Sequence, residues 1–166
     1  MEQRPNITNF LSDPKGLLIA PAGHGKTYSI AQMVSSVEAD KPQLILTHTH
    51  AGITSLKKKF REQGIPSKKY TIETICGFLQ RYVLTLCKRT EVPNQEDKNF
   101  FQQIVKIAEH LFSKPAVMRV VTQSYSHLYV DEYQDCTLDQ HKIIMLMSEE
   151  LPTHLLGDPL QGIFDF

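Results

Sequence analysis

The octapeptide Ala20-Pro21-Ala22-Gly23-His24-Gly25-Lys26-Thr27 decides how this chain folds. The apolar run at residues 16–19 before it is typical of a buried strand, and residues 28–34 after it have the pattern of a helix start. A strand, a glycine-containing loop ending in Gly-Lys-Thr and a helix form a P-loop, whose backbone N–H groups and helix N-terminus surround phosphate oxygens. The octapeptide therefore predicts a nucleoside triphosphate site, although alanine stands at its first position, where glycine is usual.

The predicted ligands of the nucleotide lie in and beside this loop. The ammonium of Lys26 is expected on the β- and γ-phosphates, and the hydroxyl of Thr27 on Mg²⁺. The triphosphate is therefore expected to bind as its Mg²⁺ complex. The residues predicted to contact it here are Ala22, Gly23, His24, Gly25, Lys26, Thr27 and Tyr28.

A carboxylate pair follows a second short apolar strand, predicted at residues 127–130. Asp131 stands where that strand ends, and the Mg²⁺ of a P-loop takes a carboxylate from a neighbouring strand. Glu132 beside it is predicted to polarise the attacking water as a general base. The alternative interpretation is a pair of solvated acids at a strand end. The P-loop in the same chain favours the metal and general-base roles.

The composition bounds the class of protein. The 166 residues fit one domain, and 41% apolar with 22% charged residues is ordinary for a globular protein. Neither a membrane span of roughly 20 apolar residues nor a signal peptide is evident, which predicts a cytoplasmic protein without a membrane partner. The odd number of cysteines and the lack of CxxC spacing predict reduced thiols at Cys76, Cys87 and Cys136. No metal site other than that for Mg²⁺ is expected.

Charge is unevenly distributed along the chain, although the net charge is zero. Residues 51–90 hold nine Lys or Arg against two acids, whereas residues 131–166 hold eight acids against one base, Lys142. Such separation is typical of a protein with one face for a polyanion and a metal site elsewhere. The alternative interpretation of the basic segment is a solvated helix face.

Apolar periodicity alternates between strand and helix along the chain. Residues 91–98 are predicted as a loop, and residues 117–126 are ambiguous. This alternation predicts an α/β fold with a mostly parallel sheet and helices on both faces. The predicted strands are 16–19, 43–47, 69–72, 127–130 and 153–157, and the predicted helices begin at 28 and cover 50–63, 74–88, 100–112 and 138–149.

In their order, the motifs of this chain resemble those of the first RecA-like ATPase domain of UvrD/Rep-like superfamily 1 DNA helicases. The resemblance covers nearly the whole chain. Its most specific part is Val130-Asp131-Glu132-Tyr133-Gln134-Asp135, followed by Gln140, and the other matching stretches are 20–27, 46–51, 71–76 and 156–164. The resemblance implies a RecA-like P-loop fold that hydrolyses ATP, with Lys26, Asp131 and Glu132 as catalytic residues.

The same resemblance implies further contacts. Gln161 would sense the γ-phosphate as another catalytic residue, and Gln3 would read adenine, although it lies farther from the P-loop than usual. Phe164 would stack on DNA bases, a contact that tolerates any sequence. The chain departs from the family at Glu73, where a histidine is common. The backbone of single-stranded DNA would be contacted by Thr47, Thr49, His50, Thr71 and Thr74.

The resemblance also implies a domain organisation. Residues 1–166 would be an N-terminal RecA-like domain with a small helical insert at about 75–125, and the second RecA-like domain, whose arginines complete the nucleotide site, is missing from this chain. Two classes of function stay open. One is the first half of an ATP-dependent helicase or translocase on single-stranded DNA. The other is a module that senses ATP or DNA ends for a nuclease partner in repair or phage defence, without unwinding.

Overall fold

The structure, a computed structural model of the chain, describes residues 7–21 and 25–158. Five described strands form one sheet in the order β1-β5-β4-β2-β3, and every neighbouring pair is parallel. The predicted α/β class with a parallel sheet is therefore confirmed. The strands are β1 (Lys15–Ile19), β2 (Gln43–Thr47), β3 (Tyr70–Thr74), β4 (Leu128–Val130) and β5 (Thr153–Gly157).

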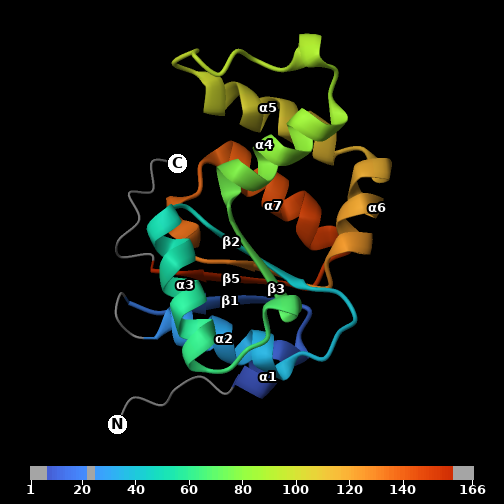
Figure 1. Cartoon of the computed structure of the whole chain (residues 1–166). Helices are drawn as coiled ribbons and strands as arrows, with labels where there is room; N and C mark the ends of the chain where they lie inside the picture. The colour runs from blue at the N-terminus through green and yellow to red at the C-terminus, as the bar shows by residue number, and fades with distance from the viewer. Residues whose placement is uncertain (1–6, 22–24, 159–166) are drawn as a thin grey trace.

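Helices cover both faces of the sheet (Figure 1). One face carries α1 (Ile7–Ser12), α2 (Lys26–Ser36) and α3 (His50–Glu62). The other carries α4 (Ile75–Leu86), α5 (Phe100–Phe112), α6 (Pro115–Ser124) and α7 (Leu138–Glu150). Three short 3-10 helices connect these elements: η1 (Ser67–Lys69), η2 (Arg89–Glu91) and η3 (Tyr133–Asp135).

The central strands are buried on both sides because their side chains alternate between two apolar layers. Leu44 and Leu46 of β2 point into the core beneath α4–α7, whereas Ile45 between them points into the core above α2 and α3. Continuous apolar runs of this kind are typical of parallel strands covered on both faces. Both cores are therefore built on the same short strands.

Three helices begin with a threonine cap directly after or near a strand end. Thr49 accepts a hydrogen bond from the backbone N–H of Gly52 at 3.0 Å, and Thr74 accepts one from Gly77 at 3.0 Å. Thr137 caps α7 and exchanges hydrogen bonds with Gln140 in a capping box. Such caps satisfy N–H groups that have no partner within the helix, and they fix where each helix starts.

The structure differs from the sequence prediction in a few elements. The ambiguous stretch 117–126 is mostly α6, which has Pro115 at its start and buries Val117, Met118 and Val121. The helix after the P-loop begins two residues earlier than predicted, at Lys26. Helices α4, α5 and α6 lie in the segment predicted as a helical insert, and they pack with α7 over one face of the sheet (Figure 1).

The register places the carboxyl ends of all five strands at one edge, called here the carboxyl edge. Leu46 lies beside Val130, and Val130 lies beside Leu155. Thr47 pairs with Thr74, and Ile19 pairs with Gly157. Loops that follow parallel strands converge at such an edge, which is where ligands bind in open α/β sheets.

Among the residues that the structure describes, no helix has both the length and the apolar character needed to cross a membrane.

Candidate active site

The buried Lys26 occupies the centre of the carboxyl edge. It is the first residue of α2, directly after Gly25, whose φ of 85° is left-handed and favours glycine. The lysine ammonium lies 3.0 Å from Oε2 of Glu132 and donates to the carbonyl of Ala20 at 3.4 Å. A buried ammonium needs such partners, since desolvating an unpaired charge is costly. The structure thus brings together residues of the P-loop and of the Asp-Glu pair.

Asp131 is a buried carboxylate with an unsatisfied oxygen. Its side chain is only 6% exposed, and Oδ1 has no hydrogen-bond partner among the described residues. Burial, together with the negative charge of Glu132, raises the pKa of Asp131 to about 6 against the opposing effect of Lys26. A buried carboxylate oxygen without a partner is what a hard cation requires as a ligand. Asp131 and the half-buried hydroxyl of Thr27 therefore have the donor chemistry to hold Mg²⁺.

Glu132 adopts an unusual backbone conformation. Its φ of 52° and ψ of 45° are left-handed, and it is the one non-glycine residue with positive φ in the described ranges. For an L-residue this conformation costs about 1–2 kcal/mol. Conformations of this kind cluster at functional sites, where the surrounding structure holds them in place. The turn directs the Glu132 carboxylate toward Lys26.

Gln134 is a site residue to which the sequence analysis gave no role. It is 9% exposed, and its amide nitrogen donates to Oε2 of Glu132 at 2.8 Å. Its amide oxygen accepts from the backbone N–H of Asp158 at 2.9 Å. A Cβ at Gly157 would lie 2.9 Å from that oxygen, so glycine leaves room for the amide. Gln134 thereby ties Glu132 to the end of β5. The only sequence signal for it was its place within the Asp-Glu motif.

The predicted nucleic-acid residues are divided between surface and interior. Thr49 and His50 are exposed at the carboxyl edge, and Thr74 is half-buried there as the cap of α4. Thr47 is 2% exposed, with its hydroxyl beneath Gly52. Thr71 pairs with Leu44 in the first half of β3, so the structure does not bring it to this edge. The accessible candidates in the described ranges are therefore Thr49, His50 and Thr74.

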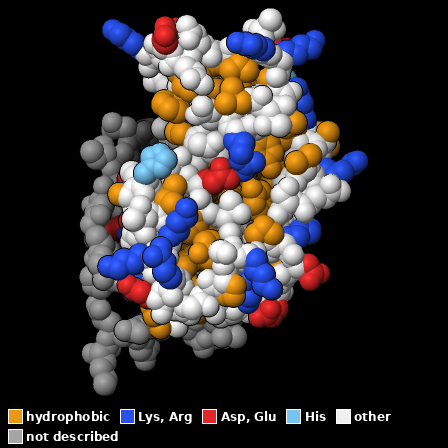
Figure 2. All heavy atoms as spheres, in the orientation of Figure 1, with side chains coloured by type: hydrophobic (Ala, Val, Ile, Leu, Met, Phe, Trp, Pro, Cys, Tyr) orange, Lys and Arg blue, Asp and Glu red, His pale blue; other side chains and the backbone are white. Residues whose placement is uncertain are grey.

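Basic side chains extend from the carboxyl edge along α3. Lys57, Lys58 and Arg61 are exposed on this helix, and Figure 2 shows Lys and Arg side chains gathered over it. Glu73 and Arg81 instead form an ion pair, with Arg81 Nη2 2.6 Å from Oε1 of Glu73. Glu73 stands where the family commonly has histidine, and its carboxylate is paired with Arg81.

Six predicted site residues lie outside the described residues. They are Gln3, Ala22, Gly23, His24, Gln161 and Phe164.

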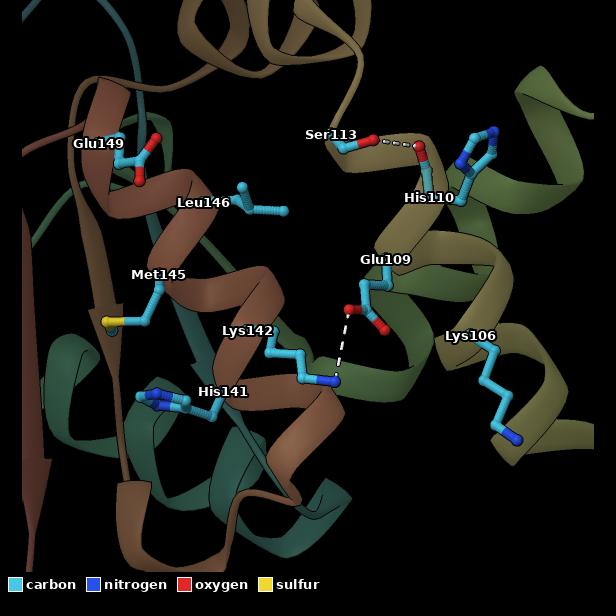
Figure 3. Close-up of a pocket in the computed structure, with 9 residues that line it drawn as sticks. All are labelled: Lys106, Glu109, His110, Ser113, His141, Lys142, Met145, Leu146 and Glu149. Carbon is cyan, nitrogen blue, oxygen red and sulfur yellow. Dashed lines mark hydrogen bonds and ion pairs between the residues drawn. The ribbon is translucent and has the colours of Figure 1, made fainter.

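An open pocket of about 630 Å³ lies between α5 and α7 and contains none of the predicted site residues (Figure 3). Lys142 forms an ion pair with Glu109 across it at 3.5 Å. His141 at its rim contacts the hydroxyl of Tyr133 next to the Asp-Glu pair. The pocket is therefore separate from the carboxyl edge, although one residue of its lining touches the motif.

A buried P-loop lysine facing an Asp-Glu pair at the carboxyl edge of a parallel sheet defines a P-loop nucleoside triphosphatase domain. Comparison with known families agrees, because the family described as AAA domain matches residues 3–166. The chain belongs to this AAA domain family.

Three relatives indicate which kind of P-loop nucleoside triphosphatase the chain resembles. Gabija protein GajB of Bacillus cereus (strain VD045) is 25% identical over 187 residues, covering 89% of this chain and 37% of that protein. An ATP-dependent helicase/nuclease protein of Syntrophomonas wolfei subsp. wolfei (strain DSM 2245B / Goettingen) is 35% identical over 66 residues, covering 40% of this chain and 5% of that protein. Exonuclease/helicase subunit RexA of Lactococcus lactis subsp. cremoris (strain MG1363) is 24% identical over 149 residues, covering 87% of this chain and 12% of that protein.

These matches confirm the predicted resemblance to the ATPase domain of UvrD-like helicases. The chain is therefore an ATPase domain, and nucleotide use follows from that membership. It spans 37% or less of the length of each of these relatives.

Proposed function

We propose that this chain is the first ATP-hydrolysing domain of a motor that moves on single-stranded DNA. The observation that carries the proposal is the convergence of Lys26, Asp131 and Glu132 at the carboxyl edge, with Lys26 and Glu132 3.0 Å apart. Two relatives whose names include helicase and nuclease support the same class of activity. The remainder of a longer polypeptide would supply the second RecA-like domain and its arginines.

In this proposal each of these groups has one role in hydrolysis. The ammonium of Lys26 leaves Glu132 and binds the β- and γ-phosphates of ATP. Thr27 and Asp131 would hold Mg²⁺, which neutralises phosphate charge when it is bound. Glu132, kept in place by Gln134, accepts the proton of the attacking water. Gln161 would report the γ-phosphate to the DNA-binding segments.

Single-stranded DNA would lie across the exposed part of the same edge. Thr49, His50 and Thr74 offer polar contacts to its backbone, and the cations of α3 continue the electropositive surface. Contacts to phosphate position a strand without reading its sequence, as a translocating motor requires. Cytoplasmic placement and the helical insert at about 75–125 remain predictions beside this proposal.

The nucleotide part of the proposal is tested by Lys26→Ala. Loss of a charge-assisted contact to phosphate is expected to weaken Mg·ATP binding by about 10- to 100-fold. Calorimetric titration of the 166-residue chain with Mg·ATP measures this, with Lys57→Ala as the control on the surface of α3. Equal affinity in wild type and Lys26→Ala would remove the P-loop assignment.

The hydrolytic part is tested by Glu132→Gln in the natural polypeptide that contains these residues. ATP binding is expected to persist, whereas turnover should fall by about 100-fold or more, the usual contribution of a general base. Wild-type turnover in this variant would exclude Glu132 from the mechanism. The isolated 166-residue chain should hydrolyse ATP very slowly, because the proposal assigns the arginines that complete the nucleotide site to a second RecA-like domain.

The second candidate is a module that senses ATP or DNA ends for a nuclease, and two relatives whose names include nuclease or exonuclease support it. Anisotropy of a labelled oligonucleotide with the natural polypeptide and an ATP analogue separates the two. The motor predicts preference for single strands, little dependence on sequence, and affinity that falls steeply with salt as counterions are released. Salt-independent binding, or no binding at low salt, would favour the sensing module.

A further inference from the structure

Helix α3 carries a row of cations on its solvent side. The helix begins at the carboxyl edge, where Thr49 caps it, and Lys57, Lys58 and Arg61 are exposed farther along it. Residues three or four positions apart lie on the same face of a helix, so Arg61 lies beside both lysines. The exposed Thr54 precedes the two lysines at the same spacing. These four residues, Thr54, Lys57, Lys58 and Arg61, are called here the α3 row.

The cations of the α3 row have no carboxylate partner within the part of the chain that the structure describes. Glu62, the one acid of α3, lies 2.7 Å from the ammonium of Lys59 and forms its ion pair there. No described Asp or Glu lies within ion-pair distance of Lys57, Lys58 or Arg61. Like charges four positions apart, such as those of Lys57 and Arg61, destabilise a helix, and a polyanion placed over them removes this repulsion.

The helix dipole does not account for the α3 row. Cations near the C-terminus of a helix are stabilised by its partial negative charge, but this effect is confined to the last turn. The basic residues of the last turn are Lys59 and Arg61. Because Lys57 and Lys58 precede that turn, the dipole gives no reason for two further lysines beside Arg61.

Lys68 extends the electropositive surface beyond the end of α3. It is exposed in η1, which follows the helix after a short connection. Its neighbour Lys69 is instead paired with Glu38 at 3.0 Å and donates to the carbonyl of Ser35 at 3.3 Å. Figure 2 shows the Lys and Arg side chains of α3 together on one face of the molecule. The positive charge of this face therefore follows α3 and continues at η1.

The α3 row has the dimensions of a short stretch of duplex. An α-helix rises about 1.5 Å per residue, so Thr54 and Arg61 lie about 10 Å apart along the helix axis. Double-stranded DNA rises about 3.4 Å per base pair, so the row spans about three base pairs. Its three cations, on long side chains, can therefore contact about two or three phosphates of one strand.

The α3 row offers no surface on which separate bases could stack. Proteins that bind single strands without sequence preference combine a positive groove with aromatic side chains under the bases. Phe60 is the one Phe, Tyr or Trp of α3, and it is 0% exposed. The bases of a duplex stack on each other, so a duplex needs only phosphate contacts from the protein. Double-stranded DNA therefore fits the row better than a single strand does.

The α3 row begins beside the proposed single-strand contacts. Thr49 and His50 lie at the carboxyl edge, and α3 leads from there toward the start of β3 at the opposite edge of the sheet. Leu56 and Phe60 pack the helix onto the sheet and are 0% exposed, so its outer face is fixed relative to the carboxyl edge. A DNA that changes from single to double strand at Thr49 and His50 would meet the row next.

We propose that the α3 row binds the phosphate backbone of a double-stranded DNA segment that adjoins the single strand at the carboxyl edge. The inference rests on the proposed motor function and adds a second DNA contact to it. Three exposed cations without a carboxylate partner among the described residues hold the duplex through its phosphates. The contact does not depend on base sequence, because phosphate carries no sequence information.

The test compares two DNA probes that bind the natural polypeptide containing these residues, in the presence of an ATP analogue. One probe is a labelled oligo(dT), and the other is the same oligo(dT) joined to a duplex. Affinity is measured by anisotropy across a salt series. The row variant reverses the three charges by the combined substitutions Lys57→Glu, Lys58→Glu and Arg61→Glu.

The matched control makes the same change in net charge at α5 and α6, on the other face of the sheet. Its three positions are exposed, and they belong to neither the nucleotide site nor the carboxyl edge. The combined substitutions of the control are Lys106→Glu, Lys114→Glu and Arg119→Glu. The control therefore separates an effect of the row from an effect of net charge.

Wild type is expected to bind the partial duplex about tenfold more tightly than oligo(dT) at low salt. Its log affinity for the partial duplex should also fall more steeply with log salt, by an additional slope of about 2–3, because each neutralised phosphate of a duplex contributes about 0.9. The row variant should lose the preference and the additional slope. Its oligo(dT) affinity should stay within about threefold of wild type, the remaining effect of net charge. The control should keep both properties of the wild type.

Equal affinity of wild type for the two probes overturns the inference and leaves the motor proposal intact. An equal loss of affinity for both probes in the row variant assigns the row to the single-strand path and also overturns it. Loss of the preference in the control would reduce the effect to net charge. Absence of oligo(dT) binding by wild type at low salt removes the motor proposal and the inference with it. If the row variant does not fold, as judged by circular dichroism, Lys57→Gln combined with Arg61→Gln replaces it in the same assays.

Discussion

The carboxyl edge and the helical layer of α4–α7 bury different kinds of side chain and serve different purposes. In the helical layer, Phe112 lies with its ring centroid 5.1 Å from that of Tyr82 and 5.9 Å from that of Phe78, and all three are buried. At the carboxyl edge, the buried groups include Lys26 and Asp131, and one oxygen of Asp131 has no partner among the described residues. One region is packed for stability, and the other holds polar groups ready for a ligand.

This difference indicates which of the two regions stabilises the folded state. Burial of large apolar side chains is the main favourable contribution to folding, whereas buried charges and left-handed residues oppose it. The helical layer therefore has to stabilise an edge that would not hold its conformation alone. Substitutions in the two regions should change stability in opposite directions.

The largest effect is expected for Phe112→Ala in the helical layer. Phe112 is 0% exposed, and truncating a buried phenylalanine removes about 3–5 kcal/mol from the free energy of unfolding. Urea denaturation of the 166-residue chain measures this, with Phe101→Ala as the control, since Phe101 is 55% exposed. A loss below about 1 kcal/mol would show that the layer does not carry the stability assigned to it.

At the carboxyl edge, Asp131→Asn should stabilise the nucleotide-free chain. A folded-state pKa of about 6 against an ordinary 3.8 corresponds to about 3 kcal/mol of destabilisation once the carboxyl group is ionised. Because the folded pKa is raised, the contribution of Asp131 to stability is fully present below about pH 4 and is lost as pH rises through about 6. Asp131→Asn has no carboxyl group to ionise at this position, so its stability should not fall for this reason over the same pH range.

Urea midpoints of wild type and Asp131→Asn at pH 4 and pH 7.5, without Mg²⁺, provide the measurement. The two proteins should converge at the lower pH and diverge at the higher one. Asp139→Asn on α7 is the control, because its carboxylate is partly exposed. A variant less stable than the wild type at pH 7.5 would show that the ionised carboxylate is stabilised by its surroundings.

The elements of both regions could largely be predicted from the sequence, since each is encoded locally. Apolar runs gave the strands, and residues 20–27 gave the P-loop. Residues 117–126 stayed ambiguous in the sequence analysis, whereas the structure buries Val117, Met118 and Val121 on one side of a helix and makes most of the stretch part of α6. The local sequence pattern was sufficient to predict those elements whose apolar residues follow the period of a strand or of a helix.

The contacts at the carboxyl edge could not be predicted in the same way, because they depend on strand order. Lys26 meets Glu132 although β5 lies between β1 and β4 in the sheet. The link from Gln134 to Asp158 likewise joins segments that are distant in sequence. Thr71 was expected at the edge because it belongs to a motif with Thr74, but β3 places it near the opposite end.

A smaller effect, on catalysis alone, is expected for Gly157→Ala. The added Cβ would displace the amide oxygen of Gln134 from its position 2.9 Å away and so release Glu132. In the natural polypeptide, kcat for ATP should fall by about tenfold, equivalent to about 1.4 kcal/mol, while Mg·ATP binding persists. Gly64→Ala is the control, since its φ of 68° strains alanine in open space far from the site. Equal kcat in wild type and Gly157→Ala would contradict the role given to Gln134.

The smallest effect is expected for the ion pair between Glu73 and Arg81. The two side chains are 23% and 47% exposed, and pairs of this kind contribute about 0.2–1 kcal/mol. A double-mutant cycle with Glu73→Gln and Arg81→Gln, followed by urea denaturation at low and high salt, isolates the coupling. A coupling energy that is large and independent of salt would contradict this expectation, because it would show that solvent does not screen the pair.

The pairing of β1 with β5 has a consequence for how the protein is made. Lys15 pairs with Thr153, and β5 is the one described neighbour of β1, so nearly the whole chain must leave the ribosome before β1 can join the sheet. At roughly 5–20 residues per second, that interval is on the order of ten seconds. During it, the strand that leads into the P-loop is available to chaperones and proteases. A chain that terminates before β5 would carry the P-loop sequence without the sheet edge on which it works.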